Sequence, residues 1–222
     1  MPELKATIVQ VTPFQQNCLL LWDAATGRGS VFDPGGEADR IFSAISEAGV
    51  TVESILLTHG HLDHAGAAEA VQQRLADVGQ PVLIIGPDRR DEFLLADIAA
   101  DARRYGLDGM ANCTPDRWLA EGEQVAAAGL TFDVLHCPGH TPGHVAFVCP
   151  AAKFAVVGDV LFHGSIGRTD FPYGDTDALL RSIRQKLLPL GDDIGFLCGH
   201  GPGSTFGTER RSNPFLAGDG LR

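Results

Sequence analysis

The chain has 222 residues, of which 44% are hydrophobic and 20% charged, and its formal net charge is −11. This composition excludes a disordered chain, and the negative charge disfavours wide contact with a phosphate backbone, so nucleic acid is not expected as a substrate. The first residues lack the apolar core of a signal peptide, no run reaches the roughly 20 apolar residues of a membrane span, and the five cysteines are scattered. We therefore expect a cytoplasmic protein, without membrane contact, that forms a single domain over residues 1–222.

The N-terminal part of the chain contains three short runs of β-favouring residues, separated by turn residues. These runs, Ala6–Val11, Asn17–Trp22 and Ser30–Phe32, predict a meander of strands. Residues Ala38–Ala48 then carry apolar side chains at helical spacing and predict a helix. The apolar run Ser54–Leu57 predicts a buried strand.

Helical and strand patterns alternate through the rest of the chain. Two helices are predicted, one ending near Gly79 and a long one over Asp88–Tyr105 whose charged residues Asp88–Glu92 form a solvated face. The predicted strands are Pro81–Ile85, Val125–Ala127, Leu130–Leu135, Phe154–Val157 and Gly195–Cys198. The order of strands, helix and strands appears twice, which predicts an α/β fold of two mixed sheets packed face to face, with helices outside. It also suggests an internally duplicated fold.

The stretch Thr58–His64 concentrates three histidines and an aspartate directly after a predicted buried strand. Burying this much polarity unpaired costs several kcal/mol, and a divalent cation would satisfy it. Side chains two positions apart in an extended turn point the same way, so His59 and His61 are expected to hold one ion. Asp63 and His64, at the start of the following helix, are expected to turn toward a neighbouring ion.

Three further polar residues follow predicted strands. His140 lies in a tight loop rich in glycine and proline, Asp159 follows a buried strand, and His200 follows a short apolar strand. The predicted ligands then form a nitrogen-rich group of His59, His61 and His140 and a mixed group of Asp63, His64 and His200. Asp159 is expected to bridge the two ions, because a carboxylate has two oxygens.

Four polar residues near these positions are given no ligand role. For His136, His144 and His163 we expect ordinary packing or hydrogen bonding, with His144 the best placed of the three to support a ligand. Asp33 precedes a proline at a strand end. A turn role is the commoner one for such an aspartate, and a supporting role at the site is the alternative.

Four motifs in this chain resemble those of the metallo-β-lactamase superfamily. They are Thr-His-x-His-x-Asp-His at 58–64, Gly-His-Thr-x-Gly-His at 139–144, Gly-Asp at 158–159 and Gly-His-Gly-Pro at 199–202. Residues Gly164–Pro172 and Glu209–Phe215 further resemble the small single-domain, glyoxalase II-like (hydroxyacylglutathione hydrolase-like) hydrolases of bacteria. The resemblance implies an αββα sandwich. The helical domain with which larger glyoxalase II enzymes grip glutathione is not expected here.

The resemblance also implies a dinuclear centre. Its ligands fall on His59, His61, His140 and Asp159 for one metal, and on Asp63, His64, Asp159 and His200 for the other. Two divalent ions are expected, with zinc as the expected metal and iron or manganese as alternatives, because histidine and carboxylate ligands suit all three.

The activity that the resemblance implies is hydrolysis of a small thioester such as S-2-hydroxyacylglutathione (S-lactoylglutathione). A metal-bound hydroxide would be the nucleophile, and Asp63 would be catalytic, orienting it. The alternative is a glutathione persulfide (sulfur) dioxygenase with a mononuclear iron, a family that resembles the chain in the same motifs. Arg168 and Tyr173 are expected to bind substrate; for Arg168 the competing interpretation is a salt bridge with Asp170 or Asp175. The sequence predicts no oligomeric state.

Overall fold

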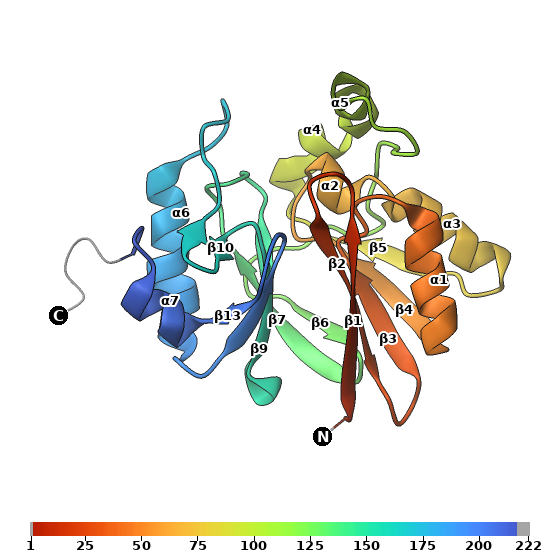
Figure 1. Cartoon of the computed structure of the whole chain (residues 1–222), viewed down its shortest axis with the longest axis horizontal. Helices are drawn as coiled ribbons and strands as arrows, with labels where there is room; N and C mark the ends of the chain where they lie inside the picture. The colour runs from red at the N-terminus through yellow and green to blue at the C-terminus, as the bar shows by residue number, and fades with distance from the viewer. Residues whose placement is uncertain (1, 217–222) are drawn as a thin grey trace.

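The computed structural model describes residues 2–216. Within this range the chain forms two mixed β-sheets that pack face to face, with helices on their outer faces (Figure 1). The predicted αββα sandwich is thereby confirmed. No helix in this range is long and apolar enough to cross a membrane. The predicted domain, 1–222, extends beyond the described residues and stays a prediction.

The first sheet contains five strands in chain order. They are β1 (Leu4–Val11), β2 (Gln16–Asp23), β3 (Arg28–Phe32), β4 (Thr51–Leu56) and β5 (Leu83–Ile85). The pairs β1–β2 and β2–β3 are antiparallel, whereas β3–β4 and β4–β5 are parallel. Parallel neighbours need a crossover, which helices α1 (Ala38–Ala48) and α3 (Ala68–Asp77) provide on the outer face (Figure 1).

The second sheet contains six strands in the order β13-β12-β9-β8-β7-β6. Their bounds are β6 (Gln124–Ala127), β7 (Leu130–His136), β8 (Val145–Cys149), β9 (Phe154–Gly158), β12 (Gly195–Cys198) and β13 (Ser204–Thr205). Only β9 and β12 pair in parallel in this sheet. Helices α6 (Thr176–Ser182) and α7 (Phe206–Ser212) lie on its outer face (Figure 1), and β10 (Leu161–Phe162) and β11 (Ser165–Ile166) form a separate small ribbon.

Alternating side chains divide the core into layers. Along β2, Leu19 and Leu21 point into the space between the sheets, whereas Leu20 points toward the helices, as the two-residue period of a strand requires. Between the sheets the ring of Phe32 packs against Phe132 and Phe147, with ring centroids 5.9 and 5.6 Å apart. This aromatic contact joins the two sheets and fixes their strand ends relative to each other.

The prediction of one long helix over Asp88–Tyr105 is wrong. The segment contains a 3₁₀ turn at Arg89–Asp91, then α4 (Glu92–Leu95) and α5 (Ile98–Tyr105). Asp91 is fully buried instead of lying on a solvated face. Its carboxylate accepts hydrogen bonds from the backbone of two distant loops, so its side chain points inward at the end of the turn.

Candidate metal centre

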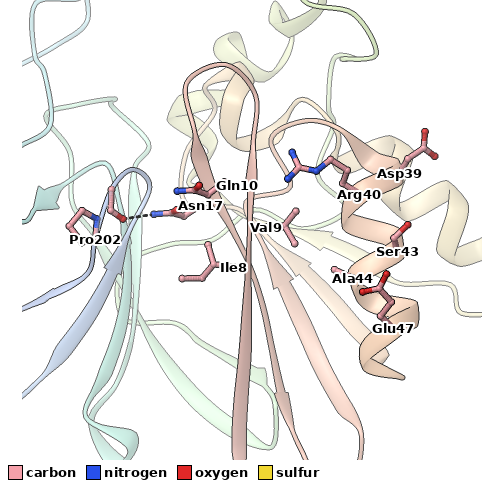
Figure 2. A pocket seen from close by; sticks show the side chains of 11 residues that line it. Ile8, Val9, Gln10, Asn17, Asp39, Arg40, Ser43, Ala44, Glu47 and Pro202 are labelled. Carbon is pink, nitrogen blue, oxygen red and sulfur yellow. Dashed lines mark hydrogen bonds between the residues drawn. The ribbon is translucent and has the colours of Figure 1, made fainter.

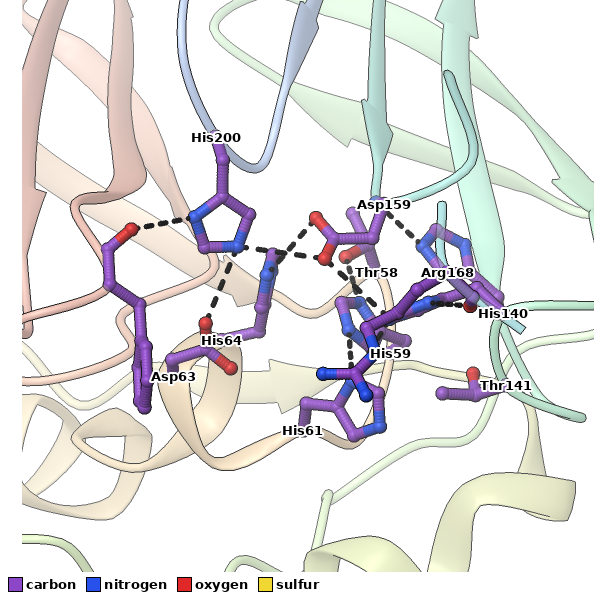
Figure 3. Close-up of polar contacts among 12 residues, drawn as sticks. Thr58, His59, His61, Asp63, His64, His140, Thr141, Asp159, Arg168 and His200 are labelled. Carbon is purple, nitrogen blue, oxygen red and sulfur yellow. Dashed lines mark hydrogen bonds and ion pairs between the residues drawn. The ribbon is translucent and has the colours of Figure 1, made fainter. Parts of the chain in front are cut away.

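The predicted ligands lie in segments that follow four strands from both sheets. The segment after β4 carries four of them and includes the short helix α2 (Leu62–Ala65), while the loops after β7, β9 and β12 carry His140, Asp159 and His200. All seven side chains meet at one edge of the sandwich (Figure 3). The donor atoms of the nitrogen-rich group, and likewise those of the mixed group, lie within 4.8 Å of one another.

In the nitrogen-rich group His59 and His140 are buried and His61 is half-buried, and all three imidazoles are neutral. Nδ1 of His61 lies 3.1 Å from Nε2 of His59 and 3.0 Å from Nε2 of His140 (Figure 3). Burial lowers the pKa of His59 and of His140, and it lowers the pKa of His61 to about 3. Neutral imidazoles with converging nitrogens are the form in which histidine binds a metal.

Three of the predicted histidine ligands, taken from both groups, form a hydrogen bond through Nδ1 that directs their Nε2 toward the centre. His140 donates from Nδ1 to the carbonyl of Arg168 (2.8 Å), His64 to the carboxylate of Asp33 (3.0 Å) and His200 to the carbonyl of Phe14 (3.0 Å). Because Nδ1 carries the hydrogen in such a tautomer, Nε2 presents a lone pair to the centre. Three rings are thus oriented as metal ligands are.

Asp33 takes the supporting role that was the alternative in the sequence analysis. Its buried carboxylate accepts from the backbone N–H and the hydroxyl of Thr58, both at 2.7 Å, and from His64. The Thr58 hydroxyl in turn accepts from Nδ1 of His59 at 3.0 Å. One carboxylate therefore orients a ligand of each group, which a turn role alone does not describe.

The mixed group carries charge. Oδ2 of Asp63 lies 3.3 Å from Nε2 of His200, and Oδ1 of Asp159 lies 3.3 Å from Nε2 of His64 (Figure 3). Burial opposes the charged forms, but Asp159 raises the pKa of His64 well above its usual value. Hydrogen bonds that His200 donates to Asp159 and Asp63 raise the pKa of His200 to about 10. Without a cation the two imidazoles would carry protons here, and a bound metal would take the place of those protons.

Asp159 contacts both groups, as the bridging prediction requires. Its Oδ2 lies 3.5 Å from Nε2 of His140 and 3.5 Å from Nε2 of His200. Burial opposes ionisation of Asp159, but the charge of His64 holds its pKa well below the usual range. Among residues 2–216, the buried atoms Oδ1 of Asp159 and Nε2 of His64 face each other at 3.3 Å as an ion pair, but neither forms a hydrogen bond. Buried polar atoms without partners are rare, and a cation between them would satisfy both, so these residues fit a metal.

Two glycines allow this close packing. A Cβ on Gly199 would overlap Oδ1 of Asp159 and approach the ring of His64, and one on Gly158 would lie 2.7 Å from the ring of His144. Nε2 of His144 accepts from the backbone N–H of Asp159 at 3.0 Å, and its ring stacks on His59, with centroids 4.6 Å apart. His144 therefore supports a ligand position, as expected.

The other two histidines lie outside the centre. Nε2 of His136 donates to the carbonyl of Pro142 at 2.8 Å, and His163 is exposed. His136 therefore has the hydrogen-bonding role that was expected, and the role of His163 stays a prediction.

Five of the seven predicted ligands line a cleft of about 510 Å³: His61, Asp63, His140, Asp159 and His200. Its wall includes five aromatic residues, Phe14, Tyr105, Phe162, Phe171 and Tyr173. A larger depression of about 850 Å³ lies between β1, α1 and Pro202, where Asn17 bonds to the loop that follows His200 (Figure 2). It contains none of the seven predicted ligands, so we place the functional site in the smaller cleft.

Arg168 and Tyr173 both line that cleft. Nε and one terminal nitrogen of Arg168 each lie 2.7 Å from an oxygen of Asp170, and the guanidinium lies over the ring of Phe171. The structure thus shows the competing interpretation for Arg168, a salt bridge that is 63% exposed on the arginine side. The hydroxyl of Tyr173 lies 2.9 Å from Nε2 of His61. Substrate binding by these two residues stays a prediction.

Comparison with known proteins agrees with this geometry. Residues 11–200 match the metallo-beta-lactamase superfamily. Hydroxyacylglutathione hydrolase GloC of Haemophilus influenzae is 49% identical over 94% of this chain and 96% of its own length, and the probable metallo-hydrolase YqgX of Bacillus subtilis is 37% identical over 95% and 97%. The chain therefore belongs to the metallo-beta-lactamase superfamily. Within it, these relatives place the chain among the metallo-hydrolases and confirm the resemblance to small glyoxalase II-like proteins.

Two solved structures are similar over nearly the whole chain. The BLEG-1 B3 metallo-beta-lactamase superposes with a TM-score of 0.86 at 34% identity, covering 96% of this chain and all of that one. TTHA1623, solved in a di-iron-bound form, superposes with a TM-score of 0.82 at 37% identity, covering 95% and 100%. These matches confirm the fold; the first protein is described as a metallo-beta-lactamase, and the second is described by its bound iron.

Proposed function

We propose that the protein is a metal-dependent thioester hydrolase of the glyoxalase II type, acting on S-2-hydroxyacylglutathiones such as S-lactoylglutathione. The observation that carries the proposal is the presence of two complete ligand groups on either side of Asp159, at the wall of an aromatic cleft. The 49% identity to a protein named hydroxyacylglutathione hydrolase supports the substrate class.

The metal ligands in this proposal are those expected from the sequence. His59, His61, His140 and Asp159 would hold one ion, and Asp63, His64, Asp159 and His200 would hold the other. Zinc is the expected metal; the donor set suits iron and manganese equally, and the di-iron form of TTHA1623 makes iron the first alternative. Two bound divalent ions supply Lewis acidity, which polarises a carbonyl and lowers the pKa of a coordinated water toward about 7.

Asp63 is the catalytic residue of the proposal. Burial opposes ionisation of Asp63, but a hydrogen bond from His200 lowers its pKa, so it is a carboxylate at neutral pH. Its Oδ2 faces His200, and its side chain, 15% exposed, lines the cleft. The other oxygen can then accept a proton from the attacking water and orient it.

The remaining residues of the cleft position the thioester. The stacked rings of Phe171 and Tyr173, with centroids 5.2 Å apart, form one wall. Arg168 can exchange Asp170 for a substrate carboxylate, because a guanidinium binds either carboxylate with two parallel hydrogen bonds. The leaving thiolate needs no proton donor, since a thiol has a pKa of about 8.5 and its anion leaves readily.

The alternative activity, a persulfide dioxygenase with one iron, is less well supported. One ion would need only one of the two ligand groups. The mixed group is nevertheless complete, and Nε2 of its buried member His64 has no hydrogen-bond partner among the described residues. We infer that two ions are bound. Because the dioxygenase family shares the same motifs, the preference for hydrolysis rests on the 49% identity to a protein named hydroxyacylglutathione hydrolase.

The test is a parallel assay of purified protein of known metal content. Cleavage of S-lactoylglutathione is expected, and it should disappear with a chelator, return on adding zinc, and be absent in Asp63→Ala. No oxygen uptake is expected with glutathione persulfide. Oxygen consumption together with one iron per chain would contradict the hydrolase and leave the fold and ligand positions unaffected.

A further inference from the structure

A buried carboxylate lies beneath the nitrogen-rich group, outside the ligand set. Asp91 belongs to a charged run in sequence, yet it is fully buried. Its Oδ2 accepts from the backbone N–H of Gly60 at 2.9 Å and from the hydroxyl of Thr141 at 2.7 Å. Its Oδ1 accepts from the backbone N–H of Gly143 at 2.5 Å. Every one of these donors belongs to a segment that carries predicted ligands.

These bonds connect the ligand segments of the two sheets. Gly60 lies between His59 and His61, after a strand of the first sheet, and Thr141 directly follows His140, after a strand of the second. A single side chain therefore holds the backbone beside all three nitrogen-rich ligands. The segment of Gly60 and the segment of Thr141 and Gly143 are therefore bridged by a single carboxylate.

The backbone is built for close approach to Asp91. A Cβ on Gly143 would lie 2.6 Å from the backbone nitrogen of Asp91, and one on Gly60 would lie 2.9 Å from Cβ of Leu94 and 3.0 Å from the carbonyl oxygen of Asp91. Real Cβ contacts are not this short, so both positions require glycine. The two loops are thus packed tightly around Asp91.

A carboxylate is an unfavourable group to bury, which makes its presence informative. Its three partners are hydrogen-bond donors without formal charge, and burial raises the pKa of Asp91 to about 6 in spite of them. Burying an asparagine would cost less free energy than burying a carboxylate. Its NH₂ group, however, is a donor and would face one of the three converging donors, leaving that donor without an acceptor. Three convergent donors therefore require the carboxylate.

We propose that Asp91 is a positioning residue of the metal centre, holding the two ligand segments so that His59, His61 and His140 converge on one ion. The inference rests on the metal-binding part of the proposed function and not on the thioester substrate. Removing the carboxylate is expected to lower the affinity of the nitrogen-rich group for its ion more than the affinity of the mixed group.

The rival explanation is that Asp91 only contributes to the stability of the fold. The chain offers a matched control in Asp23, which is 6% exposed. Its carboxylate accepts from the backbone N–H groups of Glu3 (3.0 Å) and Ala25 (3.1 Å) and from the hydroxyl of Thr26 (3.1 Å). The donor set is that of Asp91, but none of these donors neighbours a predicted ligand.

The experiment compares zinc binding in the wild type, Asp91→Asn, Thr141→Val and Asp23→Asn. Each protein is stripped of metal and titrated with zinc against a chromophoric chelator, and the melting temperature of the stripped form is measured. Two zinc ions are expected in the wild type. In Asp91→Asn one of them should bind about 10- to 100-fold more weakly, the range typical when a residue that orients ligands is lost.

The other two variants keep the proposal testable if Asp91→Asn does not fold. Thr141→Val removes one donor at constant shape, so it should weaken the same ion, but less. Asp23→Asn should lower the melting temperature and leave both zinc affinities unchanged. The proposal is overturned if Thr141→Val and Asp91→Asn bind both ions like the wild type, or if Asp23→Asn weakens zinc equally. A wild type that binds no zinc or iron would overturn the metal centre itself.

Discussion

The two halves of the molecule repeat one arrangement around the candidate site (Figure 1). In the first half, β3 is followed by Asp33 and, after α1, the parallel strand β4 leads to the histidine-rich segment. In the second half, β9 is followed by Asp159 and, after α6, the parallel strand β12 leads to His200. The duplication suggested by the sequence therefore has a counterpart in the positions of the functional residues.

The corresponding aspartates have different partners. Asp33 and Asp159 approach His64 from opposite sides, at 3.0 Å from Nδ1 and 3.3 Å from Nε2. The remaining bonds of Asp33 go to Thr58, whereas Asp159 faces the inner nitrogens of other histidines. Equivalent strand ends thus provide one acid that orients ligands and one that is placed to be a ligand. The neighbouring donors, not the strand position, decide which role an aspartate takes.

The largest effect is expected from Asp159→Ala. Because Asp159 contacts both ligand groups, its loss should lower the metal content and reduce kcat/KM by more than about 100-fold. About 100-fold is the largest loss typical of a residue that only orients a ligand. Elemental analysis of the purified variant and the thioester assay measure both quantities. If the variant still binds two ions tightly and has wild-type activity, Asp159 does not bridge the two ions.

Asp33→Ala should have the second largest effect. The change leaves the N–H of Thr58 and Nδ1 of His64 without their acceptor, which costs about 1–3 kcal/mol for each buried group. Zinc affinity is expected to fall about 10- to 100-fold, less than in Asp159→Ala. Urea unfolding of the metal-free protein and zinc titration measure the two parts separately. A variant that loses stability but keeps its zinc affinity would limit Asp33 to the fold.

Lowering the pH should separate the two ligand groups. His64 and His200 have raised pKa values, about 10 for His200, so they are protonated in the metal-free protein at neutral pH and must release protons to bind an ion. Affinity at the mixed group should therefore fall by up to about tenfold per pH unit for each released proton, throughout the range below pH 10. The nitrogen-rich group has lowered pKa values, about 3 for His61, and should be insensitive at neutral pH.

The measurement is zinc content at a fixed free zinc concentration over a series of buffers between about pH 8 and 6. One ion should leave before the other as the pH falls. Simultaneous loss of both ions would show that the two groups do not differ in this way.

The smallest effect is expected from Arg168→Ala. Its exposed ion pair with Asp170 contributes little to stability, about 1 kcal/mol at most, and the backbone carbonyl that accepts from His140 remains. We expect KM to rise by less than about tenfold and kcat to stay unchanged. This result would show that Arg168 binds a substrate carboxylate equally well in the ground state and the transition state. Asp170→Asn is the matched change, since it frees the guanidinium and should lower KM. Unchanged KM in both variants would remove Arg168 from the binding site.

That the seven predicted ligands lie together could be foreseen from the sequence, because each one lies within about eight residues after the end of a strand. A strand end and the residue after it are local features, and the glycines beside Asp159 and His200 mark the same places. The strand β8 (Val145–Cys149) was not anticipated, although it is an apolar run, because it begins immediately after the His140 loop. The two-residue strands β10 and β11 are too short to leave a pattern.

Asp91 shows what local patterns miss. Its partners Gly60 and Gly143 are 31 and 52 residues away, so nothing near Asp91 in the sequence indicates that its carboxylate turns inward. A charged run at helical spacing predicts a solvated face on average, and a single buried member is hidden within it. The supporting role of Asp33 was similarly undecided, because it depends on a contact with His64, 31 residues away.

The division of the ligands between the two sheets has a further consequence. Four of the seven follow a strand of the first sheet and three follow strands of the second. An ion bound by residues of both sets would cross-link the two sheets. It would raise the free energy of unfolding by an amount that grows with the free concentration of the ion, and this amount reaches about 4 kcal/mol when that concentration is a thousand times Kd. Metal supply would then determine how much of the protein is folded as well as how much of it is active.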